Sequence, residues 1–403
     1  MKLIRNTIIS TIFIIICILF IFIPTELDTR DSMMIQSNLF NIFRIIFILL
    51  AGIFVILESM VTKKSIVELF CITTIFILKY LFYDEIDPGI VMIIVSIFLF
   101  YSIWCNDLIS FHFIEKFINL LFYFLVIYSI LGMVFNYKQS GIIKLEFINK
   151  DVNYTAYFGF VLANYFMKIK KKRKGIFLFS LFLLTFSRLY IISLMIYILI
   201  FKFKIEIKRY TMIYLFSHVV LVIFGIIYIV LYDRVKPEYV YLTGFSRLKN
   251  LFDESNYIRF TANTLIFQIS TIKDFILGFK KNTFDGLYLF RNKSINPHNL
   301  FFGLYVQFGA IVSGIYTSKY IKIFNKYTTE FSKYYIPIIF YHCILGVSSY
   351  YGMDLIFQLI LIKIIMEKNK NGTNKDWCTD TYRACSSWIR NSKSIDEFIC
   401  WKR

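Results

Sequence analysis

Long, continuous apolar runs dominate the chain, as in Ile12–Ile23 and Val91–Ile103. The strands of a membrane β-barrel would instead alternate polar and apolar residues. An apolar run of about 20 residues is long enough to cross a bilayer as a helix. The pattern therefore predicts an all-α polytopic membrane protein.

The spacing of the apolar runs predicts about twelve transmembrane helices. The first run ends at Ile23, and Tyr335–Met366 is expected to form a last tight hairpin. The other expected single spans are Leu39–Val61, Ile66–Phe82, Gly89–Cys105, Phe117–Phe135, Tyr154–Met167, Met212–Tyr232 and Asn299–Ser318.

The apolar stretch Gly175–Phe203 is too long for one tilted helix and too short for two full spans. Basic clusters flank it on both sides, so both of its ends are expected in the cytoplasm. Two short helices are therefore predicted, with a turn near Phe186–Arg188 at or just below the outer surface.

Basic clusters also orient the remaining spans, because cytoplasmic loops collect Lys and Arg. The strongest cluster, Lys168–Lys174, falls inside, and the long polar segment 233–298 falls outside. Within that segment, Thr261–Leu277 is expected to be one amphipathic helix of an ordered lid. Both termini are expected in the cytoplasm of a bacterial cell. The expected organisation is a six-helix region (1–174), a short hairpin with the ninth span (175–232), the outer loop (233–298), the last spans (299–366) and a basic tail (367–403).

Composition supports a membrane protein and excludes several other classes. Apolar residues make up 58% of the 403-residue chain, above the roughly 45–50% of soluble proteins. The net charge of +19 is explained by basic cytoplasmic loops, and no nucleic-acid-binding motif accompanies it. The seven cysteines show no disulfide framework.

Charged residues within apolar runs are candidates for function. Glu68 and Lys79 lie near span ends, where snorkelling to the interface explains them. Arg188 lies inside an apolar stretch at an expected turn. It is either a snorkelling turn residue or a fixed cation that faces an anion of the outer leaflet.

The outer loop carries Arg247, Arg259 and Arg291, and it ends at His298. Guanidinium groups suit phosphate oxygens, and a histidine suits proton abstraction near neutral pH. The loop has none of the common metal-binding or serine-hydrolase motifs. Its chemistry is therefore expected to be metal-independent and without a cofactor, with transfer from a phosphate-activated donor.

Three segments of the second half, within Gly175–Met366, carry short motifs. They are His298-Asn299 followed by nine residues and then Gly309, Ser187-Arg188 at an expected span end, and Arg259 followed by Gly278. Together they resemble the O-antigen ligase and polymerase family, which has a His-Asn-x9-Gly pattern, a Ser-Arg pair at a span end, and an outer-loop Arg with a following Gly. Val312 departs from the family, which often has Gly, Thr or Tyr there.

The resemblance implies an inverting glycosyltransferase with a fold similar to the GT-C class, acting on the outer face of the cytoplasmic membrane. Its donor would be an undecaprenyl-diphosphate-linked oligosaccharide. His298 would be the base, Arg188 and Arg259 would stabilise the leaving diphosphate, and Asn299 would orient the acceptor or the imidazole. The resemblance also implies membrane lipid, a flippase and a chain-length regulator as partners.

The motifs do not separate a polymerase from a ligase. The composition, rich in Ile, Phe, Tyr, Lys and Asn as in AT-rich bacterial genomes, favours a polymerase that joins repeat units into O-antigen or capsule. Ligase-type transfer to another acceptor is the alternative. A flippase for lipid-linked oligosaccharides would also suit twelve spans, but it does not call for the long one-sided loop.

Overall fold

The computed structural model describes residues 63–84, 111–140, 143–145, 152–204, 210–235, 254–280, 299–326, 337–338 and 340–341. The regular structure within these residues is helical throughout. The helices are α3 (Lys63–Tyr83), α5 (Phe111–Ser140), α6 (Val152–Lys168), α7 (Lys172–Leu183), α8 (Arg188–Phe203), α9 (Tyr210–Val235), α11 (Glu254–Ile269), α12 (Ile272–Leu277) and α13 (Leu300–Lys326).

Two of these helices contain segments long and apolar enough to cross a membrane. They are Glu115–Lys138 in α5 and His218–Val235 in α9. Much of their apolar surface is not covered by other helices: Phe216 of α9 is 69% exposed, and Leu120 of α5 is 66% exposed. Several expected segments lie largely or wholly outside the described residues. They are the run that ends at Ile23, the spans at Leu39–Val61, Gly89–Cys105 and Tyr335–Met366, and the tail from Glu367.

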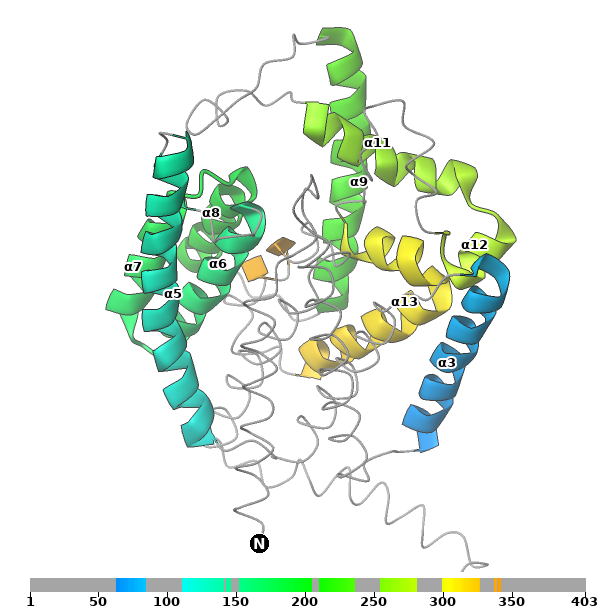
Figure 1. Ribbon diagram of the computed structural model, residues 1–403, viewed down its shortest axis with the longest axis horizontal. Coiled ribbons are helices and arrows are strands. Elements are labelled where there is room, and N and C mark those ends of the chain that lie inside the picture. Colours follow the sequence, from blue (N-terminus) through cyan, green and yellow to red (C-terminus); the bar gives the residue numbers. More distant parts are fainter. Residues whose placement is uncertain are drawn as a thin grey trace, which may run out of the picture.

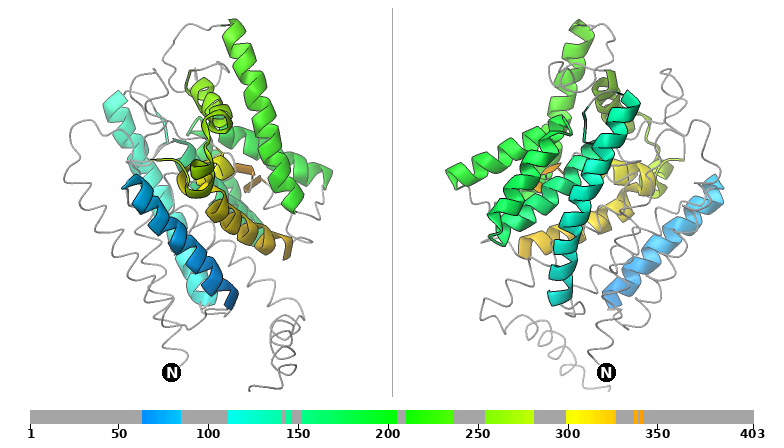
Figure 2. Two further views of the ribbon diagram at one scale, coloured as in Figure 1. Left: turned by 90° about the vertical axis from the view of Figure 1, so that its right-hand side faces the viewer. Right: turned by 60° about the vertical axis from the view of Figure 1, so that its left-hand side comes forward.

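The helices pack in two groups, which lie on the left and the right of Figure 1. In the first group, α6 packs against α7 and α8, and α5 joins it through contacts such as the edge-to-face pair of Phe122 and Phe166. In the second group, α13 packs against α3, α9, α11 and α12. Figure 2 shows both groups from the side, with the long green α9 in view.

Helix α6 is the buried centre of the first group, and small residues let α7 approach it closely. The ring of Phe182 packs directly on Gly159, where a Cβ would lie only 2.1 Å from Cγ of that ring. One turn further along α6, the carbonyl oxygen of Ala163 faces Gly175 of α7. Small residues four apart are a common way for membrane helices to reach backbone contact.

Aromatic side chains fill the rest of this core. The ring of Phe160 contacts the rings of Phe179, Tyr190 and Tyr341, with centroids 5.6–5.7 Å apart. The Tyr190 hydroxyl donates to the Phe179 carbonyl at 2.8 Å, which joins α8 to α7. Buried tyrosines commonly pair their hydroxyl groups in this way.

The break expected near Phe186–Arg188 is present, because α7 ends at Leu183 and α8 begins at Arg188. Two other expectations are wrong. The single helix expected at Thr261–Leu277 is two helices, α11 and α12, because Thr271 and Asp274 form a capping box that starts a new helix. The span expected as Asn299–Ser318 runs on to Lys326 and is broken at Gly309, which is not helical.

Candidate functional site

A tightly held turn places Arg188 at the start of α8. The Ser187 side chain caps the helix by accepting from the Tyr190 backbone N–H at 3.3 Å, and it donates to Oδ1 of Asn153 on α6 at 2.8 Å. Phe186 has a positive φ of 54°, and the Leu184 carbonyl accepts from the Leu145 N–H at 3.0 Å. The turn is therefore fixed from both sides.

Arg188 is half-buried at the first position of α8. The positive end of the helix dipole lies there, so a cation at this position gains nothing from the helix. The guanidinium group and the helix terminus would both attract an anion. Both interpretations of Arg188, a snorkelling turn residue and a fixed cation that faces an anion, stay predictions.

Asn299 caps the first turn of α13 and is fully buried. Its Oδ1 accepts from the Phe302 N–H at 3.2 Å, and its carbonyl accepts from the Gly303 N–H at 2.7 Å. The residue thus fixes where α13 begins, one position after His298 in the sequence. Sequence reasoning expected Asn299 to orient the acceptor or the imidazole, and it missed this capping role.

The two glycines of the sequence motifs, Gly278 and Gly309, meet where α12 ends and α13 breaks. We call this contact the glycine junction. Both have positive φ, 78° and 74°. A Cβ on Gly309 would lie 2.1 Å from the Ile276 carbonyl oxygen and 2.9 Å from the Gly278 nitrogen. Only glycine fits such a backbone-to-backbone approach. Figure 1 shows α13 as two segments that meet at a bend beside α12.

The carbonyl groups released by the break in α13 have new partners. The Val306 carbonyl accepts from the Phe279 N–H at 2.7 Å. The Gln307 carbonyl accepts from Nζ of Lys79 on α3. Buried backbone groups need hydrogen-bond partners. The fold supplies partners for the carbonyl groups at the break, so the break is part of the folded structure.

Helix α3 holds the glycine junction from the other side. Lys79 is 3% exposed, so the interpretation as a snorkelling residue is wrong for it. The Tyr83 hydroxyl donates to Oδ1 of Asp274 at 2.8 Å, and Nζ of Lys273 lies 4.2 Å from the centroid of the Tyr83 ring. The sequence did not reveal that Lys79 and Tyr83 contact α12 and α13. The only signal for these contacts was a lysine within an apolar run.

Arg259 lies on α11, and its side chain is outside the described set. Helix α11 rests on α9 through stacked rings of Tyr257 and Tyr232, with centroids 4.4 Å apart. Burial, and then a hydrogen bond to Asp233 and its charge, raise the pKa of Tyr257 above its ordinary value. The hydrogen bond to Asp233 helps to tie α11 to the end of α9.

The structure brings some of the candidate residues together. Asn299, the backbone of Arg259 and both motif glycines belong to the second group of helices, whereas Arg188 belongs to the first group. His298, Arg247 and Arg291 lie outside the described residues.

No family model, no curated protein and no solved structure matches the chain. The sequence motifs and the geometry of the described residues therefore carry the functional argument.

Proposed function

We propose that the protein is a membrane glycosyltransferase that polymerises undecaprenyl-diphosphate-linked repeat units into O-antigen or capsular polysaccharide. The observation that carries the proposal is the glycine junction. Gly278 and Gly309 were selected on sequence grounds alone, and both have positive φ and lie in contact with each other.

The proposed arrangement has about twelve spans in the bacterial cytoplasmic membrane. The apolar segment of α5, 24 residues long, would extend about 36 Å, enough for the roughly 30 Å hydrocarbon core. Helix α7, with 12 residues, would extend only about 18 Å from the basic cluster at its start. Arg188 would then lie below the outer surface, where its attraction for an anion is less screened than in water.

In the proposed reaction, the acceptor sugar hydroxyl attacks the anomeric carbon of the donor. The bond from that carbon to the phosphate oxygen breaks, and the configuration inverts. His298 takes the proton of the hydroxyl. Arg188 and Arg259 stabilise the diphosphate, whose negative charge grows as it leaves. Asn299, which caps α13, orients the acceptor or the imidazole.

Glycan analysis of a deletion strain tests the proposal and separates the alternatives. A missing polymerase leaves single repeat units on the carrier lipid or on the cell surface. A missing ligase leaves long polymer on the carrier lipid, and a missing flippase leaves repeat units on the cytoplasmic face. Normal surface polymer in the deletion strain would contradict every one of these functions.

A further inference from the structure

The turn between α6 and α7 concentrates positive charge at one end of the first helix group. Between positions 168 and 174 every residue but Ile169 is a lysine or arginine. The turn is tight: Lys170 has a positive φ of 63°, and the Lys171 N–H donates to the Phe166 carbonyl at 2.9 Å. The cations are therefore held on a fixed backbone.

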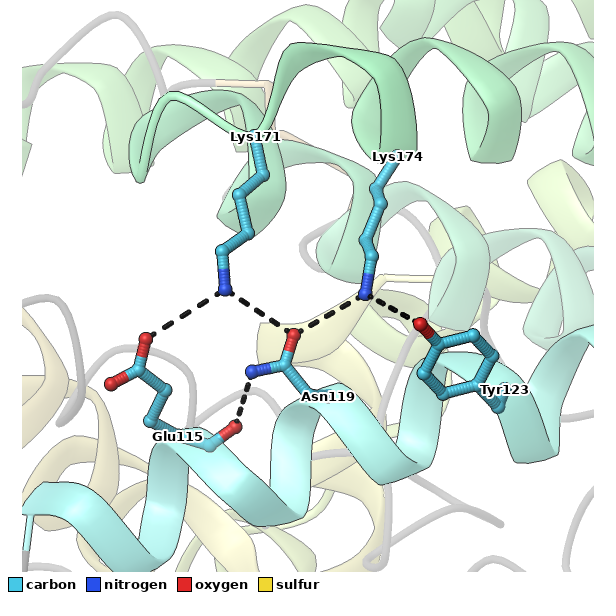
Figure 3. Close-up of polar contacts among 5 residues, drawn as sticks. All are labelled: Glu115, Asn119, Tyr123, Lys171 and Lys174. Carbon is cyan, nitrogen blue, oxygen red and sulfur yellow. Dashed lines mark hydrogen bonds and ion pairs between the residues drawn. The ribbon is translucent and has the colours of Figure 1, made fainter.

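Two of these lysines point inward and fasten the turn to α5, as Figure 3 shows. Nζ of Lys171 lies 3.8 Å from a Glu115 carboxylate oxygen. Lys171 and Lys174 both donate to Oδ1 of Asn119 at 3.4 Å, and Lys174 also donates to the Tyr123 hydroxyl at 3.4 Å. The ammonium group of Lys174 further lies 4.6 Å from the centroids of the Phe122 and Tyr123 rings. The side chains of Lys171 and Lys174 therefore hold the turn against α5.

The turn carries three further cations at the surface. Lys170, Lys172 and Arg173 are exposed, and none has an ion pair within the described part of the chain. The first turn of α7 begins at Lys171 without a side-chain cap. Its N–H groups add to the positive potential of the three cations.

Apolar side chains beside the turn set its depth in a membrane. Ile176 and Phe177 follow it on α7 and are 56% and 48% exposed, and Leu120 of α5 is 66% exposed. Exposed apolar groups within one helical turn of the cations suit acyl chains. The cations would then lie at the level of the lipid phosphates.

We propose that Lys170, Lys172 and Arg173 bind the phosphate group of an anionic glycerophospholipid in the inner leaflet. The inference rests on the membrane location that forms part of the proposed function. It assigns the inner face of the protein to lipid recognition, away from the outer-face chemistry. Anionic head groups attract clustered Lys and Arg strongly near the membrane surface.

Native mass spectrometry of the detergent-purified full chain tests the proposal. The chain is mixed with phosphatidylglycerol or with phosphatidylcholine of the same acyl composition. We expect phosphatidylglycerol to be retained preferentially by the unaltered chain. Substitution of Lys170, Lys172 and Arg173 by Gln should weaken its retention by about tenfold or more. A large excess of inorganic phosphate should compete poorly, because it lacks the acyl chains.

A charge-matched control replaces the exposed Lys138, Arg234 and Lys280 by Gln and should keep the preference. A second variant, with Lys170 and Lys172 replaced by Arg, should keep it as well. Equal retention of the two lipids, or equal loss in both Gln variants, would overturn the proposal and leave an acidic protein as the partner to test. Because the readout needs no activity, lipid selectivity without polymer synthesis would overturn the proposed function alone.

Discussion

Arg188 and Arg259 are the residues at which charge and geometry can be separated. Lysine keeps the positive charge but loses the planar two-point contact with diphosphate oxygens. Replacing either Arg by Lys should cost about 2–4 kcal/mol of transition-state stabilisation. Polymer synthesis, measured at equal protein levels in the membrane, checks this.

Arg234 of α9 provides the matched control, because it is exposed and has no assigned role in the chemistry. The change of Arg234 to Lys should leave polymer synthesis unchanged. Normal polymer from both the Arg188→Lys and Arg259→Lys variants would show that these residues do not clamp the diphosphate.

The glycine junction gives a second prediction at the level of single residues. Gly309→Ala places a Cβ in contact with the Ile276 carbonyl. It also puts alanine into a backbone conformation (φ 74°, ψ 176°) that is essentially restricted to glycine and costs about 1–3 kcal/mol by itself. We expect a lower melting temperature in detergent and little polymer. Gly314→Ala, five positions further along α13, meets nothing within 4 Å and should be neutral or stabilising by about 1 kcal/mol. Equal effects of the two changes would contradict the account of the junction.

At single positions, sequence reasoning found residues but not always their roles. Gly278, Gly309 and Arg188 were selected from motif spacing. In the structure, the two glycines have positive φ and Arg188 is the first residue of α8. Lys79 was misinterpreted because its partner, the Gln307 carbonyl, is released only by the break in α13. A contact between residues so far apart in the chain leaves no local pattern in the sequence.

At the level of elements, α3 is expected to hold α12 and α13 in place. Tyr83→Phe removes the hydrogen bond to Asp274 and should lower the stability by about 1 kcal/mol. Tyr80→Phe, one turn earlier at a 43% exposed position, is the control and should change nothing. Thermal unfolding of both variants in the same detergent is the measurement, and an unchanged melting temperature for Tyr83→Phe would remove α3 from this role.

The positions of the helices were easier to predict than their interruptions. Apolar runs located α3, α5, α6 and α9 to within a few residues at most ends, because burial in protein or lipid needs an apolar surface over the whole helix. The break between α11 and α12 could also have been found. Thr271-Ile272-Lys273-Asp274 is a capping-box pattern, but it lies within a continuous amphipathic stretch that favoured one helix. The break at Gly309 depends on its contact with Gly278 and could not be derived locally.

At the level of the whole molecule, the topology makes a direct prediction. The basic turn binds α5 near Glu115, and the Leu184–Arg188 turn lies beside Leu145, which follows the other end of α5. Cysteines introduced at Arg173 and Asp233, in a cysteine-free background, should react on opposite sides of the membrane. An impermeant thiol reagent on intact cells should label position 233 and not position 173. Labelling of position 173 alone would invert the topology and move the proposed chemistry to the wrong face.

The most direct test of the central claim uses purified protein in vesicles, supplied with lipid-linked repeat units and analysed for product length. We expect polymer that is unaffected by chelator and a rate that falls as the solution becomes acidic, because an imidazolium cannot accept a proton. The His298→Ala variant should be slower by about 10²–10⁴-fold, whereas His112→Ala and His218→Ala should stay near the unaltered rate. A fully active His298→Ala protein, or an unaltered protein silenced by chelator, would contradict the account.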